Sequence, residues 1–159
     1  MIYNHLGKSG LKVSELCLGT MLFGKETNAK DSQTIIASAL DNGVNFIDTA
    51  DAYVAGESEK LIGRLIKANR NKWVLATKLA NKINTVPYSG GLSRKWVVEA
   101  CDNSLRRLGT DYIDIYYLHK EDHVTPLDET IRAIGLLMSQ GKIRYFGVSN
   151  YRSWRVAEI

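Results

Sequence analysis

The feature that most constrains the fold of this chain is the regular alternation of short apolar runs with longer amphipathic stretches. Runs of five or six residues rich in β-branched side chains, bounded by turn or charged residues, are typical of buried strands. Five such runs predict strands over residues 15–19, 44–48, 73–78, 113–118 and 144–149. A β-hairpin around residues 7–10 is expected to precede the first of these strands.

The stretches between the runs carry apolar residues at helical spacing. Helices are predicted over residues 31–42 and 57–68, between Ser93 and Gly109, between Thr125 and Gly141, and from about residue 152 onward. Ser93 is expected to be a helix N-cap, and Thr125 followed by Pro126 predicts a cap and the first helical residue. Glycines are favoured just past helix ends, which is where three of them stand: Gly43, Gly109 and Gly141.

Strand–helix alternation predicts a parallel sheet with right-handed crossovers. The strands begin about 32 residues apart, and eight such units need about 250 residues, the usual size of a (β/α)8 TIM barrel. The 159 residues hold five units. The chain is therefore either a complete open sheet of five strands or a parallel barrel truncated after roughly five β/α units. The last residues are in mid-helix, which favours the truncated barrel. No linker divides residues 1–159, so a single domain is expected.

Composition excludes several classes of protein. With 45% hydrophobic and 24% charged residues, the chain is typical of a globular domain rather than a disordered one. The net charge is +4, and its charges are mixed along the sequence, so Arg106 and Arg107 are expected to be solvated and no nucleic-acid binding is expected. No apolar stretch approaches the ~20 residues of a membrane helix. There is no signal-peptide core, so a cytoplasmic location is expected. Cys17 and Cys101 lie in apolar segments and are expected in a reduced core.

Polar side chains stand where three of the predicted strands end. Asp48 ends the second strand, Lys78 the third and His119 the fourth, and Tyr53 follows Asp48 by five residues. Each alone is also an ordinary strand terminator, helix cap or loop residue. Because ligands of parallel α/β folds bind at the carboxyl ends of the strands, the four together predict a site.

The four side chains suit proton transfer to a carbonyl oxygen. A phenol is a weak acid at neutral pH, and a neighbouring ammonium favours the phenolate, so Lys78 would make Tyr53 a stronger acid. Asp48 would hold Lys78 charged, and His119 would donate a hydrogen bond to the carbonyl. Tyr53 would then protonate the developing alkoxide as general acid. Such a site has no hydride of its own, so a nicotinamide cofactor must supply it.

Several long motifs resemble those of the aldo-keto reductase family. The first is GVNFIDTADAYVAGESE over residues 43–59. The second is DYIDIYYLH over residues 111–119, and the third is GKIRYFGVSNY over residues 141–151. Leu16, Gly19 and Thr20 are similar to the family's opening strand. The resemblance covers essentially the whole chain.

The resemblance implies a function and a set of site residues. It identifies Asp48, Tyr53, Lys78 and His119 as a catalytic tetrad. It implies cofactor contacts from Asp48 and from two further groups: Gly19, Thr20 and Met21 in the first loop, and Ser149 and Asn150, which would hold the nicotinamide carboxamide. The implied reaction reduces an aldehyde or ketone to an alcohol with NADPH, or alternatively with NADH.

The chain also departs from the family pattern. Strands six to eight of the barrel have no counterpart, and most cofactor pyrophosphate contacts come from that part. The chain alone is therefore expected to be inactive, and the complementary C-terminal part of the barrel is an expected partner. Val54 replaces a frequent glycine, and residues 120–123 differ from the commoner sequence, which affects the substrate pocket.

Other functions remain open on the sequence. Barrels of this family also serve as redox-sensing subunits of channels, and the chain could be an inactive fragment of a longer reductase. His119 and His123 are four residues apart, but they lie in a loop with no third ligand nearby, so no metal site is expected.

Overall fold

Five parallel strands form the centre of the computed structural model, which describes residues 1–159. They are β3 (Cys17–Gly19), β4 (Phe46–Asp48), β5 (Val74–Leu79), β6 (Ile113–Leu118) and β7 (Ile143–Val148), and they pair in that order. The order confirms the predicted succession of parallel strands. The first two strands begin two residues later than predicted, because residues ahead of them pair with the hairpin or with turns.

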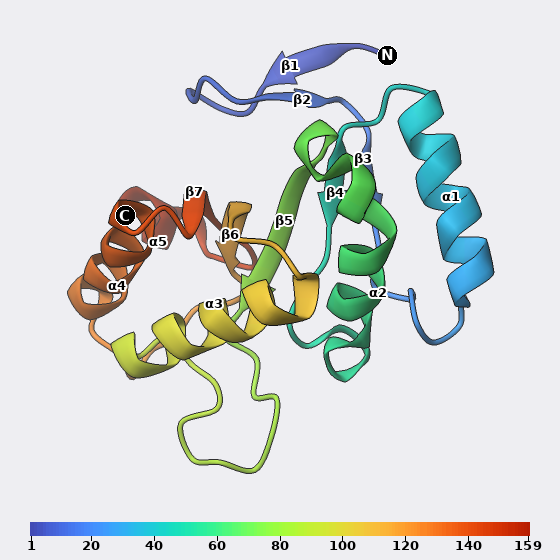
Figure 1. Ribbon diagram of the computed structural model, residues 1–159. Helices are drawn as coiled ribbons and strands as arrows, with labels where there is room; N and C mark the ends of the chain where they lie inside the picture. The colour runs from blue at the N-terminus through green and yellow to red at the C-terminus, as the bar shows by residue number, and fades with distance from the viewer.

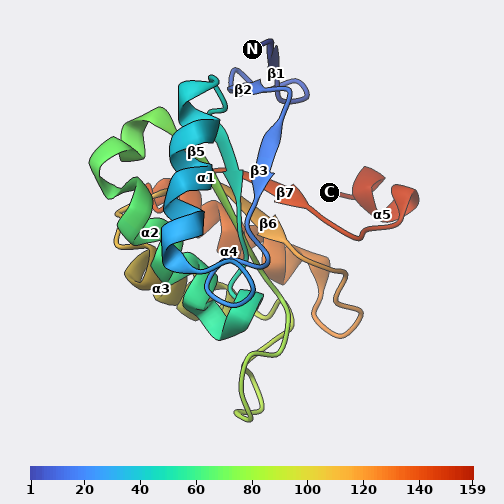
Figure 2. The same ribbon diagram turned by 90° about the vertical axis from the view of Figure 1, so that its right-hand side faces the viewer.

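The helices alternate with these strands as predicted. They are α1 (Ala29–Asp41), α2 (Glu57–Ile66), α3 (Arg94–Leu108), α4 (Leu127–Ser139) and the short α5 (Ser153–Ala157). A 3₁₀ segment, η1 (Tyr53–Gly56), precedes α2, and a second one, η2 (Lys67–Lys72), replaces the last predicted turn of that helix. Figure 2 shows α1, α2 and α3 on one side of the strands.

The helix ends follow local hydrogen bonding. Ser93 caps α3 by accepting a hydrogen bond from the Trp96 N–H, as predicted. The prediction of Thr125 as a cap is wrong, because its hydroxyl donates to Asp122 and the N-cap is Pro126. Helix α1 begins two residues earlier than predicted, because the Asn28 side chain accepts from the Asp31 N–H.

Two apolar clusters lie on opposite faces of the sheet. The larger one packs the helices against the outward-facing side chains of the strands, among them Leu75, Tyr116 and Leu118. The smaller one packs Val74, Ala76 and Ile115 on the other face against the hairpin. That antiparallel hairpin is formed by β1 (Tyr3–His5) and β2 (Lys12–Ser14), as predicted. Figure 1 shows it at the opposite end of the sheet from the long loop after β5.

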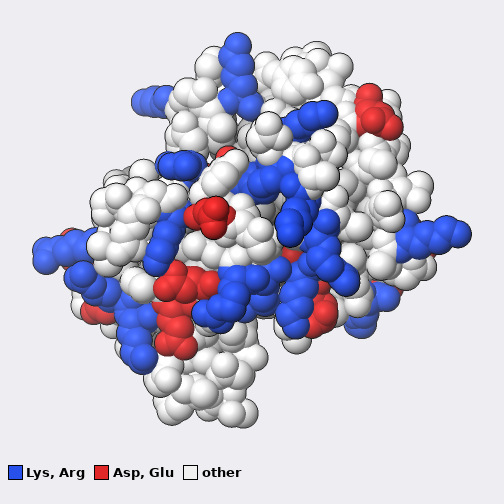
Figure 3. All heavy atoms as spheres, in the orientation of Figure 1, with Lys and Arg blue, Asp and Glu red and all other residues white.

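The surface differs from the sequence expectation at two positions. Cys17 is exposed rather than packed in a core, whereas Cys101 is buried, and both are free thiols. Arg107 is not solvated, since it forms an ion pair with the fully buried Glu59. Elsewhere, Figure 3 shows basic and acidic side chains interspersed on the face that carries α2 and α3. None of the helices has the length and apolar character needed to span a bilayer.

Candidate active site

The carboxyl ends of all five parallel strands contribute to one rim of the sheet. Gly19 ends β3, Asp48 ends β4 and Ser149 follows β7 directly. Lys78 is the penultimate residue of β5, and His119 follows β6. The register aligns Gly19 with Asp48, and the bonds between neighbouring strands continue past the strand ends, as in the bond from the Ser149 N–H to the Leu118 carbonyl at 2.9 Å. Parallel pairing therefore brings together side chains that are far apart in sequence.

Lys78 is the centre of the polar cluster. Its ammonium donates to the Asp48 carboxylate at 2.5 Å, to the Thr49 carbonyl at 2.7 Å and to the Tyr53 hydroxyl at 3.2 Å. These three bonds use all three donor hydrogens of the ammonium. Lys78 is 7% exposed. Because these partners compensate its burial, the charge sits at a fixed point beside the Tyr53 oxygen.

Burial has opposite effects on the two neighbouring ionisable groups. It raises the pKa of Asp48 above its usual range, although the hydrogen bond from Lys78 opposes the change. It lowers the pKa of His119, and the positive charges of Lys78 and Lys120 lower it further. Both effects favour the neutral imidazole of His119 over the charged form.

Tyr53 is placed by an unusual backbone segment. Val54 and Ala55 have left-handed φ angles of 49° and 53°, and Gly56 follows at 88°. Such angles are rare for a β-branched residue such as Val54. This tight bend separates Tyr53 from α2 and leaves its ring next to His119, with ring centroids 5.9 Å apart in an edge-to-face arrangement.

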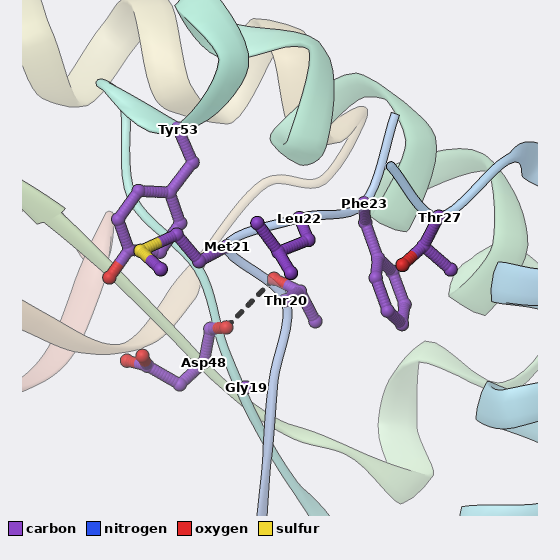
Figure 4. Close-up of a pocket in the computed structure, with 8 residues that line it drawn as sticks. All are labelled: Gly19, Thr20, Met21, Leu22, Phe23, Thr27, Asp48 and Tyr53. Atoms are coloured by element: carbon purple, nitrogen blue, oxygen red, sulfur yellow. Dashed lines mark hydrogen bonds between the residues drawn. The ribbon is translucent and has the colours of Figure 1, made fainter. Parts of the chain in front are cut away.

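A pocket of about 360 Å³ opens beside Tyr53 and Asp48. Its other lining residues are the last residue of β3 and residues of the loop that follows: Gly19, Thr20, Met21, Leu22, Phe23 and Thr27. Figure 4 shows Tyr53 and Asp48 at one end of the pocket and Phe23 and Thr27 at the other. Thr20 is buried, and its hydroxyl donates to the Asp48 carbonyl at 2.8 Å, whereas the Met21 side chain is exposed.

Ser149 and Asn150 lie on the His119 side of the rim. The Asn150 amide nitrogen donates to the His119 carbonyl at 2.8 Å and to the Ser149 hydroxyl at 3.1 Å. Asn150 has a left-handed φ of 56°, which asparagine tolerates better than most residues. The structure thus gathers the four predicted tetrad residues into one cluster, with the predicted cofactor residues on either side of it.

Sequence reasoning missed five residues of this site. Thr49 contributes its carbonyl, and Asn81 places its amide nitrogen 3.1 Å from His119 Nδ1. The other three are Leu22, Phe23 and Thr27 of the pocket wall. A backbone carbonyl leaves no sequence signal, and a loop asparagine is too common to be one. The structure shows no candidate metal site. His123 Nε2 lies 3.2 Å from Glu121 Oε2, and no group of three or more metal-ligating side chains is present.

Comparisons with known proteins agree with this architecture. The aldo/keto reductase family model matches residues 15–159. The aldo-keto reductase AKR11C1 from Bacillus halodurans, solved in its holo form, superposes with a TM-score of 0.89 at 40% identity, covering 99% of this chain and 53% of that one.

Two curated relatives have different descriptions. The uncharacterized oxidoreductase YrpG of Bacillus subtilis is 41% identical, covering 99% of this chain and 52% of its own. The probable voltage-gated potassium channel subunit beta of Arabidopsis thaliana is 38% identical, covering 99% and 49%. The chain spans about half the length of these relatives. Its five parallel β/α units correspond to part of a (β/α)8 barrel, and the chain belongs to the aldo/keto reductase family.

Proposed function

We propose that this chain supplies the proton-transfer and carbonyl-binding groups of an NAD(P)H-dependent reductase of aldehydes or ketones, with NADPH as the expected cofactor. The observation that carries the proposal is the Lys78 ammonium, held by Asp48 and the Thr49 carbonyl and bonded to the Tyr53 hydroxyl. This arrangement stabilises the phenolate that remains after Tyr53 has given up its proton.

The roles of the four side chains follow from their positions. Tyr53 protonates the carbonyl oxygen as it becomes an alkoxide. Lys78 stabilises the resulting negative charge, and Asp48 together with Thr49 keeps the ammonium in place. His119, whose pKa is lowered by burial and by nearby positive charges, would donate a hydrogen bond that orients the same oxygen.

The residues present fit a nicotinamide. Asn150 uses its amide nitrogen in both of its hydrogen bonds, so its amide oxygen can accept from a carboxamide N–H while the Ser149 hydroxyl bonds to the same group. The pocket formed by Gly19, Thr20 and Met21 beside Tyr53 would hold the ring and the substrate. When bound, the cofactor supplies the hydride that this protein lacks.

A second candidate function is a redox-sensing subunit of a channel. It is favoured by the 38% identity to a plant protein described as a probable voltage-gated potassium channel subunit beta. In that case Asp48, Tyr53, Lys78 and His119 would reduce a carbonyl compound slowly, and the reaction would regulate the channel.

The test is carbonyl-dependent oxidation of NADPH by a completed barrel. The completed barrel is a hybrid protein in which residue 159 is joined to the second half of the Bacillus subtilis relative. That relative is 41% identical to this chain over the part that the two proteins share. We expect multiple turnovers with at least one simple aldehyde, and loss of turnover in the Lys78→Met variant. A folded hybrid that binds NADPH but turns over no member of an aldehyde and ketone panel would contradict the reductase proposal.

A further inference from the structure

Asn81 occupies a fixed position at the start of the loop after β5. The preceding residue, Ala80, is buried and has a φ of +115°, which L-residues rarely adopt. The backbone is held on both sides of this bend, because the Leu79 carbonyl accepts from the His119 N–H at 2.8 Å and the Ala80 carbonyl accepts from the Gly91 N–H at 2.9 Å. The chain therefore turns sharply and directs Asn81 toward the end of β6.

The orientation of the Asn81 amide in the structure assigns the proton on His119. The amide nitrogen of Asn81 lies 3.1 Å from Nδ1 of His119. An amide NH₂ group donates hydrogen bonds and does not accept them. Nδ1 must therefore be the acceptor and carry no proton. A neutral imidazole has a single N–H, so that proton is on Nε2.

The charged surroundings favour the same state. Lys78 on β5 and Lys120, the residue after His119, are both positive, and with burial they lower the pKa of His119. The Tyr53 ring meets the imidazole edge to face. The nearest acidic residue along the chain, Glu121, is directed to the Arg152 N–H and to His123. An imidazolium would also need Nδ1 to donate, which the Asn81 donor opposes.

We propose that Asn81 is a positioning residue that holds His119 as the neutral imidazole with its proton on Nε2. The ring then presents a hydrogen-bond donor on the side away from Asn81, as binding of a substrate carbonyl oxygen requires. The role toward a carbonyl rests on the proposed function, whereas the tautomer assignment does not.

The tautomer is measurable on the 159-residue chain itself. Ring-nitrogen NMR of the ¹⁵N-labelled chain distinguishes protonated, pyrrole-type nitrogens from unprotonated, pyridine-type ones. The chain has three histidines, which makes assignment simple. We expect His119 at neutral pH to show a pyrrole-type Nε2 and a pyridine-type Nδ1. His5 is an internal contrast, because its Nδ1 lies 3.2 Å from the Ser9 carbonyl, which can only accept.

Substitutions at Asn81 should change the tautomer and the pKa of His119 in a predicted direction. In Asn81→Asp the carboxylate accepts, so the proton should move to Nδ1 of His119 and the pKa of His119 should rise. Asn81→Leu removes the donor without adding charge, so the preference for Nε2–H should weaken. The matched control is Asn84→Asp in the same loop, where the side chain contacts the Val86 N–H rather than His119. This control should leave the His119 signals unchanged.

The outcomes separate this inference from the proposed function. A protonated Nδ1 in the unsubstituted chain, or unchanged His119 signals in both folded Asn81 variants, would overturn the tautomer assignment. In the completed barrel, Asn81→Asp should lower kcat about 10²-fold, the scale of losing one preorganised donor, with unchanged affinity for NADPH. A tautomer shift with unaltered kcat would overturn the positioning role. A completed barrel that is inactive without any substitution would contradict the proposed function and leave the NMR result standing.

Discussion

Arg107 on α3 donates to Glu59 on α2 through a hydrogen bond of 2.6 Å between Nε and Oε2. Glu59 is fully buried, and its other carboxylate oxygen accepts from the Thr77 hydroxyl at 2.6 Å. Thr77 directly precedes Lys78 in β5. The ion pair therefore anchors the strand that carries the central ammonium of the candidate site.

Breaking this pair should be costly. Arg107→Met leaves an uncompensated carboxylate in the interior, which costs about 3–5 kcal/mol of the free energy of unfolding. Urea denaturation of the chain measures the loss. The double variant Glu59→Gln with Arg107→Met should recover much of it, because no buried charge remains. The control is Arg132→Met, which breaks an exposed pair with Asp128 and should change stability by less than about 0.5 kcal/mol. An equal loss of unfolding free energy in Arg107→Met and Arg132→Met would show that the buried pair stabilises the chain no more than the exposed pair does.

We expect Asp51 to lower the stability of the chain as pH rises. Its side-chain oxygens are buried and have no hydrogen-bond partner. Burial, followed by the charge of Glu59, raises the pKa of Asp51 to about 7. Between about pH 4 and 7 the folded chain keeps a proton that the unfolded chain has lost, so unfolding becomes easier through this window and the cost is complete above it. The upper limit is about 4 kcal/mol, from about 1.4 kcal/mol per pKa unit.

The Asp51→Asn variant isolates this effect. At pH 4 its free energy of unfolding should equal that of the unsubstituted chain. At pH 8 its free energy of unfolding should be larger by several times RT. Urea denaturation at each pH measures the difference. Asp41→Asn, at an exposed position at the end of α1, is the control and should show no such pH-dependent difference. Parallel stability curves for Asp51→Asn and the unsubstituted chain would refute the assignment.

Gly63 is required by the contact between α2 and α3. A Cβ at this position would lie 2.1 Å from the Leu108 carbonyl oxygen, so the backbone of one helix would have to move. Gly63→Ala should therefore destabilise the chain by at least about 1–3 kcal/mol. Gly135 on α4 has open space around it, so Gly135→Ala should stabilise the chain by about 0.5–1 kcal/mol through helix propensity. The paired melting temperatures test the opposite signs directly, and a gain in both variants would contradict the packing.

Cofactor binding should depend on the rest of the barrel. This chain carries the proposed nicotinamide contacts, but it spans about half the length of its relatives. We expect the 159-residue chain to bind NADPH weakly or not at all by calorimetry, and the completed barrel to bind it at micromolar concentration. Micromolar binding by the verified monomeric 159-residue chain would contradict this prediction.

The fold was largely predictable because its elements have strong local signals. The strands β5 and β6 are short runs of mostly apolar residues, and Ser93 and the glycines that follow the helices mark the helix ends. The start of α4 was misplaced for a local reason. A residue before proline is restricted to extended conformations, and Pro126 itself has a ψ of 133°, so the helix begins only at Leu127. Thr125 then bonds to Asp122 instead of capping.

The candidate site was predictable from the strand ends and from the motifs around them. Asp48, Lys78 and His119 follow from the topology, since neighbouring parallel strands bring their carboxyl ends together. Asn81 does not follow, because its approach to His119 depends on the left-handed turn at Ala80, which no neighbouring glycine signals. The ion pair of Glu59 with Arg107 joins residues 48 positions apart, and single-sequence patterns do not register such long-range pairs.

The most direct test of the central claim is the turnover of the Tyr53→Phe variant of the completed barrel. The substitution removes the hydroxyl bonded to Lys78 and keeps the aromatic ring beside His119. If Tyr53 is the proton donor, kcat for aldehyde reduction should fall at least ~10²-fold, while the dissociation constant for NADPH changes little. Near-normal kcat in this variant would show that the proton comes from another group and would contradict the proposed mechanism.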